Sequence, residues 1–192
     1  KLKELRTMAK RTNFGIPYGI MHKRLMYQLW EAGASATERT TKKLLADWEA
    51  GFGKAHAQLE AWKDKVVGTG QLITPTGRKR RLPGGSRHTY HGQRKLRQGI
   101  NFPIQSLASD ITLVALLLLH KFFEANGGAR LTLTVHDSIM GEYHPDWSHK
   151  EIEDNVRRIM VDETLQYMKD RWNLADGLPI TVDVDTGMER WK

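Results

Sequence analysis

The sequence predicts an α+β fold, and three observations lead to this class. Apolar residues recur at helical spacing over long stretches of the first two thirds of the chain. The period then changes to two over residues 131–143, as in a half-buried hairpin. At 192 residues and 40% hydrophobic content, the chain can also bury a sizeable core.

The first helical pattern runs from Leu2 to about Trp30 and contains a proline. Pro17 lacks a backbone N–H and its ring clashes with the carbonyl of Asn13 in a regular helix, at a cost of about 3 kcal/mol. We therefore expect a kink or break between Asn13 and Tyr18.

A second helical stretch is predicted from about residue 36 to residue 67. Its large apolar side chains recur at near-helical spacing and are predicted to lie in the core. They are Trp48, Phe52, Leu59 and Trp62.

The next segment, 71–83, has two short extended runs around a Pro-Thr-Gly sequence and predicts a hairpin with a basic second arm. Residues 84–98 are polar, basic and glycine-containing, which indicates a loop leading into a helix. A helix is expected to restart near Pro103 and to continue to about residue 125.

Alternation over 131–136 and 139–143 predicts two strands joined by a turn at Asp137 and Ser138. A helix over 148–172 and a last strand over 180–185 complete the predicted fold.

The composition limits the classes of partner and compartment. Thirty Lys and Arg against 22 Asp and Glu give a net charge of +8, which suits a polyanion such as nucleic acid without demonstrating one. The chain has no cysteine, which excludes disulfides and thiolate zinc sites and fits a reducing interior. The longest apolar run, 111–119, is far shorter than the roughly 20 residues that span a bilayer, so no membrane segment is predicted. The chain begins without an initiator Met and within a helical pattern, so we expect a piece of a longer protein.

Four residues of the first helical pattern are spaced by four and would share one face. These are Arg6, Lys10, Phe14 and Tyr18. Two cations followed by two aromatic rings would present charge to a triphosphate and flat surface to a base and sugar. The same pattern, taken alone, fits an ordinary amphipathic helix with a solvated basic end.

Two further patterns can contact nucleic acid or metal. Arg97, Asn101 and Gln105 are again spaced by four and can bond to phosphates and minor-groove base edges. Asp137 directly follows His136 at the predicted hairpin turn. An isolated Asp there is more often a turn former, because its side chain bonds to nearby backbone.

Four blocks in this order resemble the C-terminal half of the family A DNA polymerases, the bacterial DNA polymerase I and phage replicase group. The blocks are RTMAKRTNFGIPYG (6–19), TPTGRKRRLP (74–83), INFPIQSLASDI (100–111) and VHDSI (135–139). The resemblance covers nearly the whole chain. It implies a partial right-hand polymerase fold, with a helical fingers subdomain over 1–85 and, over 86–192, a palm with a small antiparallel sheet and long helices.

For the first block, the resemblance implies a nucleotide-binding helix. Arg6 and Lys10 would bind the incoming triphosphate, and Lys10 would also be a catalytic residue that protonates the pyrophosphate leaving group. Phe14 would stack on the nucleotide, and Tyr18 would lie near the templating position.

For the later blocks, the resemblance implies contacts to DNA and metal. Residues Arg97, Asn101 and Gln105 would contact template or primer, and His136 would touch the primer end. Asp137 matches the family's catalytic, metal-binding carboxylate. Its partner carboxylate lies, in the family, on a strand that would precede Lys1.

The resemblance therefore implies an enzyme that adds deoxynucleotides to a primer with two Mg²⁺ ions. Its partners would be template-primer DNA, dNTP and the N-terminal part of the polymerase, in the same chain or a separate one. The isolated chain is expected to be inactive. We expect a cytoplasmic location in a bacterium or a phage-infected cell.

Two alternatives stay open. Ser138 stands where the family most often has Glu, and His-Asp-Ser also occurs in the related single-subunit phage RNA polymerases, although Phe14-Gly15 and 103–111 look like the DNA enzymes. A non-catalytic, nucleic-acid-binding remnant would keep the basic surface without chemistry. Such a binder needs phosphate contacts but no carboxylate at the turn.

Overall fold

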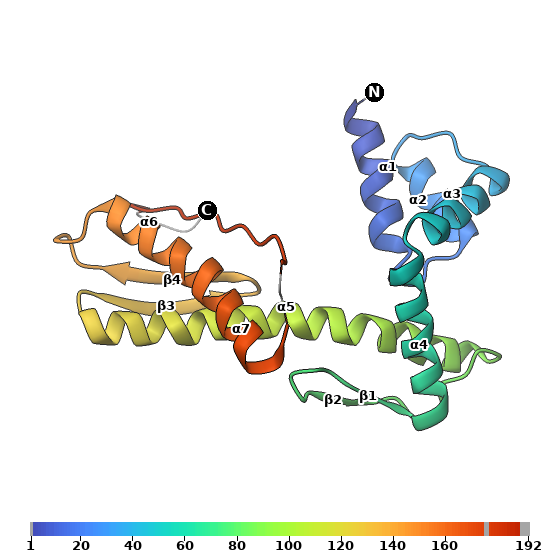
Figure 1. The fold of residues 1–192 in the computed structure, drawn as a ribbon. Coiled ribbons are helices and arrows are strands. Elements are labelled where there is room, and N and C mark those ends of the chain that lie inside the picture. Colours follow the sequence, from blue (N-terminus) through green and yellow to red (C-terminus); the bar gives the residue numbers. More distant parts are fainter. Residues whose placement is uncertain (1, 175–176, 189–192) are drawn as a thin grey trace. The chain divides into compact units, whose positions relative to one another are not determined.

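The computed structural model describes residues 2–174 and 177–188 and confirms the α+β class (Figure 1). The chain forms two compact units. The first contains the residues up to Thr74 together with Arg78–Ile104, and the second contains Pro75–Gly77 and the residues from Gln105 on. The division into fingers and palm at residue 85 stays a prediction, and each unit is described below by itself.

The first unit begins with two helices, α1 (Leu2–Gly15) and α2 (His22–Glu31), and the break predicted at Pro17 lies between them. The N–H of Ile16 still donates to the carbonyl of Thr12 at 3.1 Å, but the chain then reverses through a turn. Gly19 closes that turn at φ +74°, a backbone conformation that L side chains rarely adopt.

The predicted second helical stretch is two helices, α3 (Glu38–Gly51) and α4 (Gly53–Thr69). They are separated by Phe52, whose backbone leaves helical geometry at φ −117° and ψ 40°. Because the chain bends there, the Phe52 side chain is 53% exposed, and its predicted place in the core is wrong. Trp48 and Leu59 are buried as predicted, and they pack together with Ile100.

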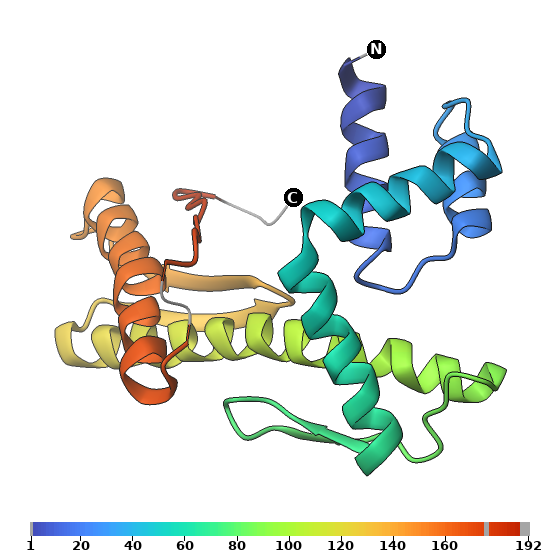
Figure 2. The same ribbon diagram turned by 45° about the vertical axis from the view of Figure 1, so that its right-hand side comes forward.

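The predicted hairpin is confirmed as β1 (Gln71–Ile73) paired antiparallel with β2 (Lys79–Arg81). Helix α4 leads into β1 (Figure 2). Buried residues of α4, β1 and the following segments form one core of the first unit. This core consists of Val66, Leu72, Leu82 and Leu96.

Helix α5 (Tyr90–Asn126) is longer than predicted. The loop expected over 84–98 ends at Thr89, whose hydroxyl accepts from the N–H of Gly92 at 3.1 Å. The expected restart near Pro103 is also wrong, because the helix runs through Pro103 without ending. The residue four positions before it is Gly99, which packs closely on α4: a Cβ there would lie 2.7 Å from Cγ2 of Val66. Packing of this part of α5 outweighs the one backbone bond that proline removes.

The second unit is built on the hairpin of β3 (Ala129–Val135) and β4 (Ser138–Tyr143), which pair antiparallel with a register shift between Leu131 and Leu133. One face of the hairpin packs on α5, on α6 (His149–Arg157) and on η1 (Arg158–Glu163), after which α7 (Thr164–Trp172) continues the helical stretch. The buried centre consists of Leu119, Phe123, Ile152 and Ile159.

Two predicted details of the second unit are wrong. The turn consists of His136 and Asp137 rather than Asp137 and Ser138, since Ser138 already pairs with Val135. The strand expected over 180–185 is irregular, although its residues alternate between half-buried and exposed. Within the described part of the chain, neither two-stranded sheet extends to this segment, so no neighbouring strand supplies the backbone hydrogen bonds that a strand needs.

Helix α5 is also the one described helix long and apolar enough to cross a membrane by length and composition. Its most apolar window has a mean hydropathy of 1.8 and is 28% buried. Core helices of soluble proteins pass the same test, and Leu119 and Phe123 of α5 lie in the core of the second unit.

Candidate active site

The four residues predicted to bind nucleotide line one open depression on the first unit. Arg6, Lys10 and Phe14 come from α1, and Tyr18 comes from the turn that follows it. The depression has a volume of about 830 Å³. The structure therefore brings these four residues together, although helix α1 ends between Phe14 and Tyr18.

The depression combines positive charge with flat apolar surface. The Nζ atom of Lys10 lies 6.0 Å from the centroid of the Phe14 ring. Both cations are exposed, and Phe14 and Tyr18 are 59% and 43% exposed, so ring faces and charges are accessible to solvent. Such a surface can hold a polyanion at one end and an aromatic base at the other.

Three further residues line this depression: Gly15 at the end of α1 and two polar residues that no sequence pattern singled out. The polar residues are Arg11 and Gln28, and the guanidinium of Arg11 donates to the carbonyl of Gln28, which joins α1 to α2. Arg11 lies outside the four-residue spacing that singled out its neighbours. Gln28 is brought there by the reversal at Pro17, which no local pattern could have indicated.

A second depression, of about 370 Å³, connects the turn after α1 with the start of α5. Tyr18 lines both depressions, and Arg97 lines the second one. Arg97 can pack against the turn after α1 because residue 19 is glycine: a Cβ at Gly19 would lie 2.9 Å from Cγ of Arg97. The predicted DNA-binding Arg97 thus lies beside a predicted nucleotide-binding residue.

The other two residues of the predicted DNA-binding face differ in exposure. Asn101 is half-buried, and its Oδ1 is shielded from solvent with no hydrogen-bond partner among the described residues. Gln105 is exposed. Since α5 is continuous, Arg97, Asn101 and Gln105 follow one slowly drifting face of a single helix.

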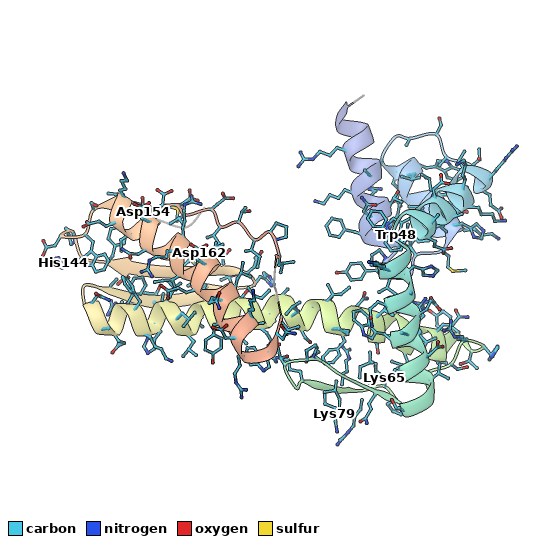
Figure 3. The ribbon with its side chains drawn as sticks, viewed as in Figure 1. Trp48, Lys65, Lys79, His144, Asp154 and Asp162 are labelled. Carbon is cyan, nitrogen blue, oxygen red and sulfur yellow. The ribbon has the colours of Figure 1, made fainter. Side chains whose placement is uncertain are left out.

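The first unit also carries basic residues near the β1–β2 hairpin. Lys65 on α4 and Lys79 on β2 extend outward from their elements (Figure 3). The guanidinium of Arg80 lies 5.8 Å from the ring centroid of Phe102 on α5. Arg80 thus packs on α5, whereas the adjacent Lys79 and Arg81 are exposed to solvent.

In the second unit, His136 and Asp137 form the tip of the β3–β4 hairpin, and both are exposed. His136 has φ 56°, one of two positive values among the described non-glycine residues. Such residues are uncommon and cluster at functional sites, and a two-residue hairpin loop requires positive φ at its first position. The positive φ of His136 therefore forms the tight turn that holds Asp137 at the tip of the hairpin.

The described residues do not by themselves fit a two-ion magnesium site. No group of three or more His, Cys, Asp or Glu side chains that could hold a metal occurs among them. Magnesium is bound through one or two carboxylates together with substrate phosphates, and a pair of ions needs more than one carboxylate. Asp137 can supply only a part of such a site.

Comparison with known proteins identifies the class to which this fold and these residues belong. The family model described as DNA polymerase family A matches residues 2–192. The chain belongs to DNA polymerase family A.

Its relatives include bacterial and phage polymerases. The chain is 28% identical over 184 residues to DNA polymerase I of Helicobacter pylori, a match that covers 91% of this chain and 20% of the relative. It is 28% identical over 187 residues to the DNA polymerase of Bacillus phage SP01, covering 96% of this chain and again 20% of the relative. The chain thus spans about a fifth of the length of these relatives.

A solved structure supports the fold. The POL domain of Pol1 from M. smegmatis, in complex with DNA primer-template and dNTP, matches with a TM-score of 0.72 and 28% identity. The match covers 83% of this chain and 27% of that one.

Proposed function

We propose that this chain is the nucleotide- and primer-binding part of a DNA-directed DNA polymerase, which adds deoxynucleotides to a primer 3′-hydroxyl. One observation carries the proposal: Arg6, Lys10, Phe14 and Tyr18, chosen from the sequence, line one depression. The M. smegmatis structure, a complex with DNA primer-template and dNTP, supports the same ligands for this chain.

In this proposal the cations of α1 bind the triphosphate, and Lys10 also protonates the leaving pyrophosphate. Phe14 stacks on the incoming nucleotide, and Tyr18 lies near the templating base. Arg97, Asn101 and Gln105 contact template or primer from α5. His136 contacts the primer end.

Asp137 would provide one ligand for Mg²⁺. When bound, a pair of magnesium ions neutralises phosphate charge and aligns the reacting oxygens. Since the two-residue tip of the hairpin, His136 and Asp137, holds one carboxylate, we propose that a second carboxylate comes from another part of the polymerase. The relatives are about five times as long as the matched segment, which leaves room for such a part.

Nucleotide binding tests the role of α1 without requiring catalysis. Binding of a fluorescent dNTP to the purified chain should be weakened at least about tenfold by Lys10→Ala, since a charge-assisted bond contributes about 1.5–3 kcal/mol. The matched control is Lys65→Ala, which removes an exposed lysine on α4, away from the depression. Equal affinities of the two variants would contradict the proposed role of Lys10.

Primer extension tests the need for a further part. With template-primer, dNTPs and Mg²⁺, the chain alone should incorporate no nucleotide. Addition of the part of the polymerase that carries the second carboxylate should restore extension, and Asp137→Asn should abolish the restored extension. Extension by the chain alone that disappears in the Asp137→Asn variant would refute the need for a second source of carboxylate.

The same experiment decides between an enzyme and a nucleic-acid-binding remnant. A remnant would bind DNA in a salt-dependent way, as an enzyme would, so binding alone does not separate them. A restored extension that depends on Asp137 favours the enzyme. The relatives are DNA polymerases, which favours deoxynucleotide addition over the phage RNA polymerase alternative.

A further inference from the structure

Arg11 of α1 is bound to α2, unlike the two cations that were predicted to bind nucleotide. Its guanidinium donates to the backbone carbonyl of Gln28 and lies 3.9 Å from the carboxylate of Glu31. The Arg11 side chain is 34% exposed, whereas Arg6 and Lys10 on the same helix are fully accessible to solvent. Arg11 therefore lines the depression with a guanidinium that is already engaged.

The end of α2 lacks a basic residue of its own. Residues 28–31 are Gln, Leu, Trp and Glu, so a carboxylate stands at the negative end of the helix dipole. The helix also tightens there, because the N–H of Ala32 donates to the carbonyl of Leu29 at 3.1 Å. The carbonyl of Gln28, which Ala32 would serve in a regular helix, accepts from Arg11 instead. Arg11 thus supplies from α1 the cation and the donor that the last turn of α2 needs.

Helix α1 has few other attachments among its described side chains. Thr12 is buried, and Gly15 packs closely on Ile20, since a Cβ at Gly15 would lie 3.0 Å from Cγ2 of that residue. Both contacts lie near the end of α1 that the turn joins to α2. The other described side chains of the helix, at 6, 9–11, 13 and 14, are exposed or half-buried. The direction of α1 therefore depends strongly on the polar contact of Arg11.

From these contacts we infer that Arg11 is a positioning residue, whose bond to α2 fixes the direction of α1 and thereby the place of Lys10 and Phe14 at the nucleotide. The inference rests on the proposed function, since it takes the depression as the nucleotide site. Successive residues point about 100° apart around a helix, so Lys10 can face the ligand while Arg11 holds α2. Cations that are held in place before binding lose less conformational freedom, so affinity for dNTP depends on a residue that does not contact it.

A double-mutant cycle tests whether Arg11 acts through Lys10. Binding of the fluorescent dNTP to the full chain is measured for Arg11→Ala, for Lys10→Ala and for the double variant. Arg11→Ala should weaken binding at least about fivefold, but at most about twofold further when residue 10 is already alanine, because coupled residues do not contribute independently. Additive losses would overturn the inference, since Arg11 would then bind the phosphates by itself.

Two further variants separate positioning from a general loss of charge. Arg39→Ala removes an exposed arginine of α3 that is not among the residues lining either depression, and it should leave dNTP binding unchanged. Arg11→Lys keeps a cation that can donate to the carbonyl, and it should bind dNTP within about twofold of the original chain. If Arg11→Lys bound as weakly as Arg11→Ala, the bond to Gln28 would not be the cause and the inference would fail.

Amide hydrogen exchange, followed by mass spectrometry, tests the same attachment without a ligand. Exchange over residues 2–15 should be faster in Arg11→Ala than in the original chain, because a helix released from its neighbour opens more often. Arg39→Ala should exchange like the original chain. Unchanged exchange over α1 in Arg11→Ala would also overturn the inference.

Failure of the inference is distinguishable from failure of the proposed function. Equal dNTP affinities of Lys10→Ala and Lys65→Ala would refute nucleotide binding at α1, whatever Arg11 does. A loss in Lys10→Ala together with additive effects in the cycle, or with unchanged exchange, would leave that function in place and remove only the positioning role of Arg11.

Discussion

Replacing Gly19 by alanine tests whether the turn after α1 positions Arg97 for binding DNA. Gly19 has φ +74°, and an added Cβ would lie 2.9 Å from Cγ and 3.2 Å from Cδ of Arg97. Cβ atoms essentially never approach other atoms that closely, so the Arg97 side chain must move. Because it is long and flexible, its movement costs little stability but displaces the guanidinium.

The Gly19→Ala substitution should lower both the stability of the chain and its affinity for DNA. Alanine in the left-handed region costs about 1–2 kcal/mol, which should lower the melting temperature of a chain of this length by about 2–8 °C. Displacing the guanidinium should additionally weaken primer-template binding by roughly 1 kcal/mol, or about fivefold, if Arg97 contacts DNA.

Gly33→Ala is the control that separates these two effects. Gly33 has φ +79° and nothing within 4 Å of an added Cβ, so it has the same backbone cost without the contact. Thermal denaturation should give similar losses for the two variants, whereas anisotropy with a labelled primer-template should show weaker binding for Gly19→Ala alone. Identical DNA affinities for the two variants would refute the reasoning that places Arg97 at the DNA.

Three further predictions concern stability. Thr76→Val removes the hydroxyl that donates to buried Asp110 at 2.6 Å, and should lower the free energy of unfolding by about 1–3 kcal/mol in urea denaturation; a loss below about 0.5 kcal/mol would contradict this reading. Burial works to raise the pKa of Glu60, but hydrogen bonds from two cations, Arg87 among them, bring it below the usual 4.5. The stability that Glu60 contributes is therefore present above about pH 4.5 and is lost as the pH falls through its lowered pKa. Between about pH 5 and pH 3, the melting temperature of Arg87→Gln should fall less steeply with pH than that of the original chain. Equal dependence of the melting temperature on pH in both proteins would count against the ion pair. Ser148→Ala removes the capping box of α6 and should cost about 1 kcal/mol, whereas Ser148→Thr should keep most of it, as thermal denaturation of both would show.

Local pattern was sufficient for much of the candidate site. The spacing of four from Arg6 to Tyr18 placed four residues on one surface, and the structure shows them around one depression. The two-residue alternation predicted the hairpin that carries Asp137. Both patterns depend on residues within a few turns or a few strand positions, where the geometry of the chain itself brings side chains together.

Other features depend on neighbours distant in sequence. Gln28 joins the depression through the reversal at Pro17, and Arg97 packs against the turn at Gly19, where no side chain blocks it. Helix α5 runs through Pro103 although local rules predicted a restart there. Packing decided these points, because burial of one helix face outweighs a single missing backbone bond.

The sequence by itself therefore determined the family, the periods of the helices and strands, and four of the residues that line the depression beside α1. Only the tertiary structure decided which segments meet. The segment 180–185 has the alternation of a strand, but among the described residues no strand pairs with it. The loop of the β3–β4 hairpin lies one residue earlier than predicted, which places His136 at positive φ. The physical reason is that periodicity is a property of each segment, whereas pairing, close approach and burial are properties of two segments together.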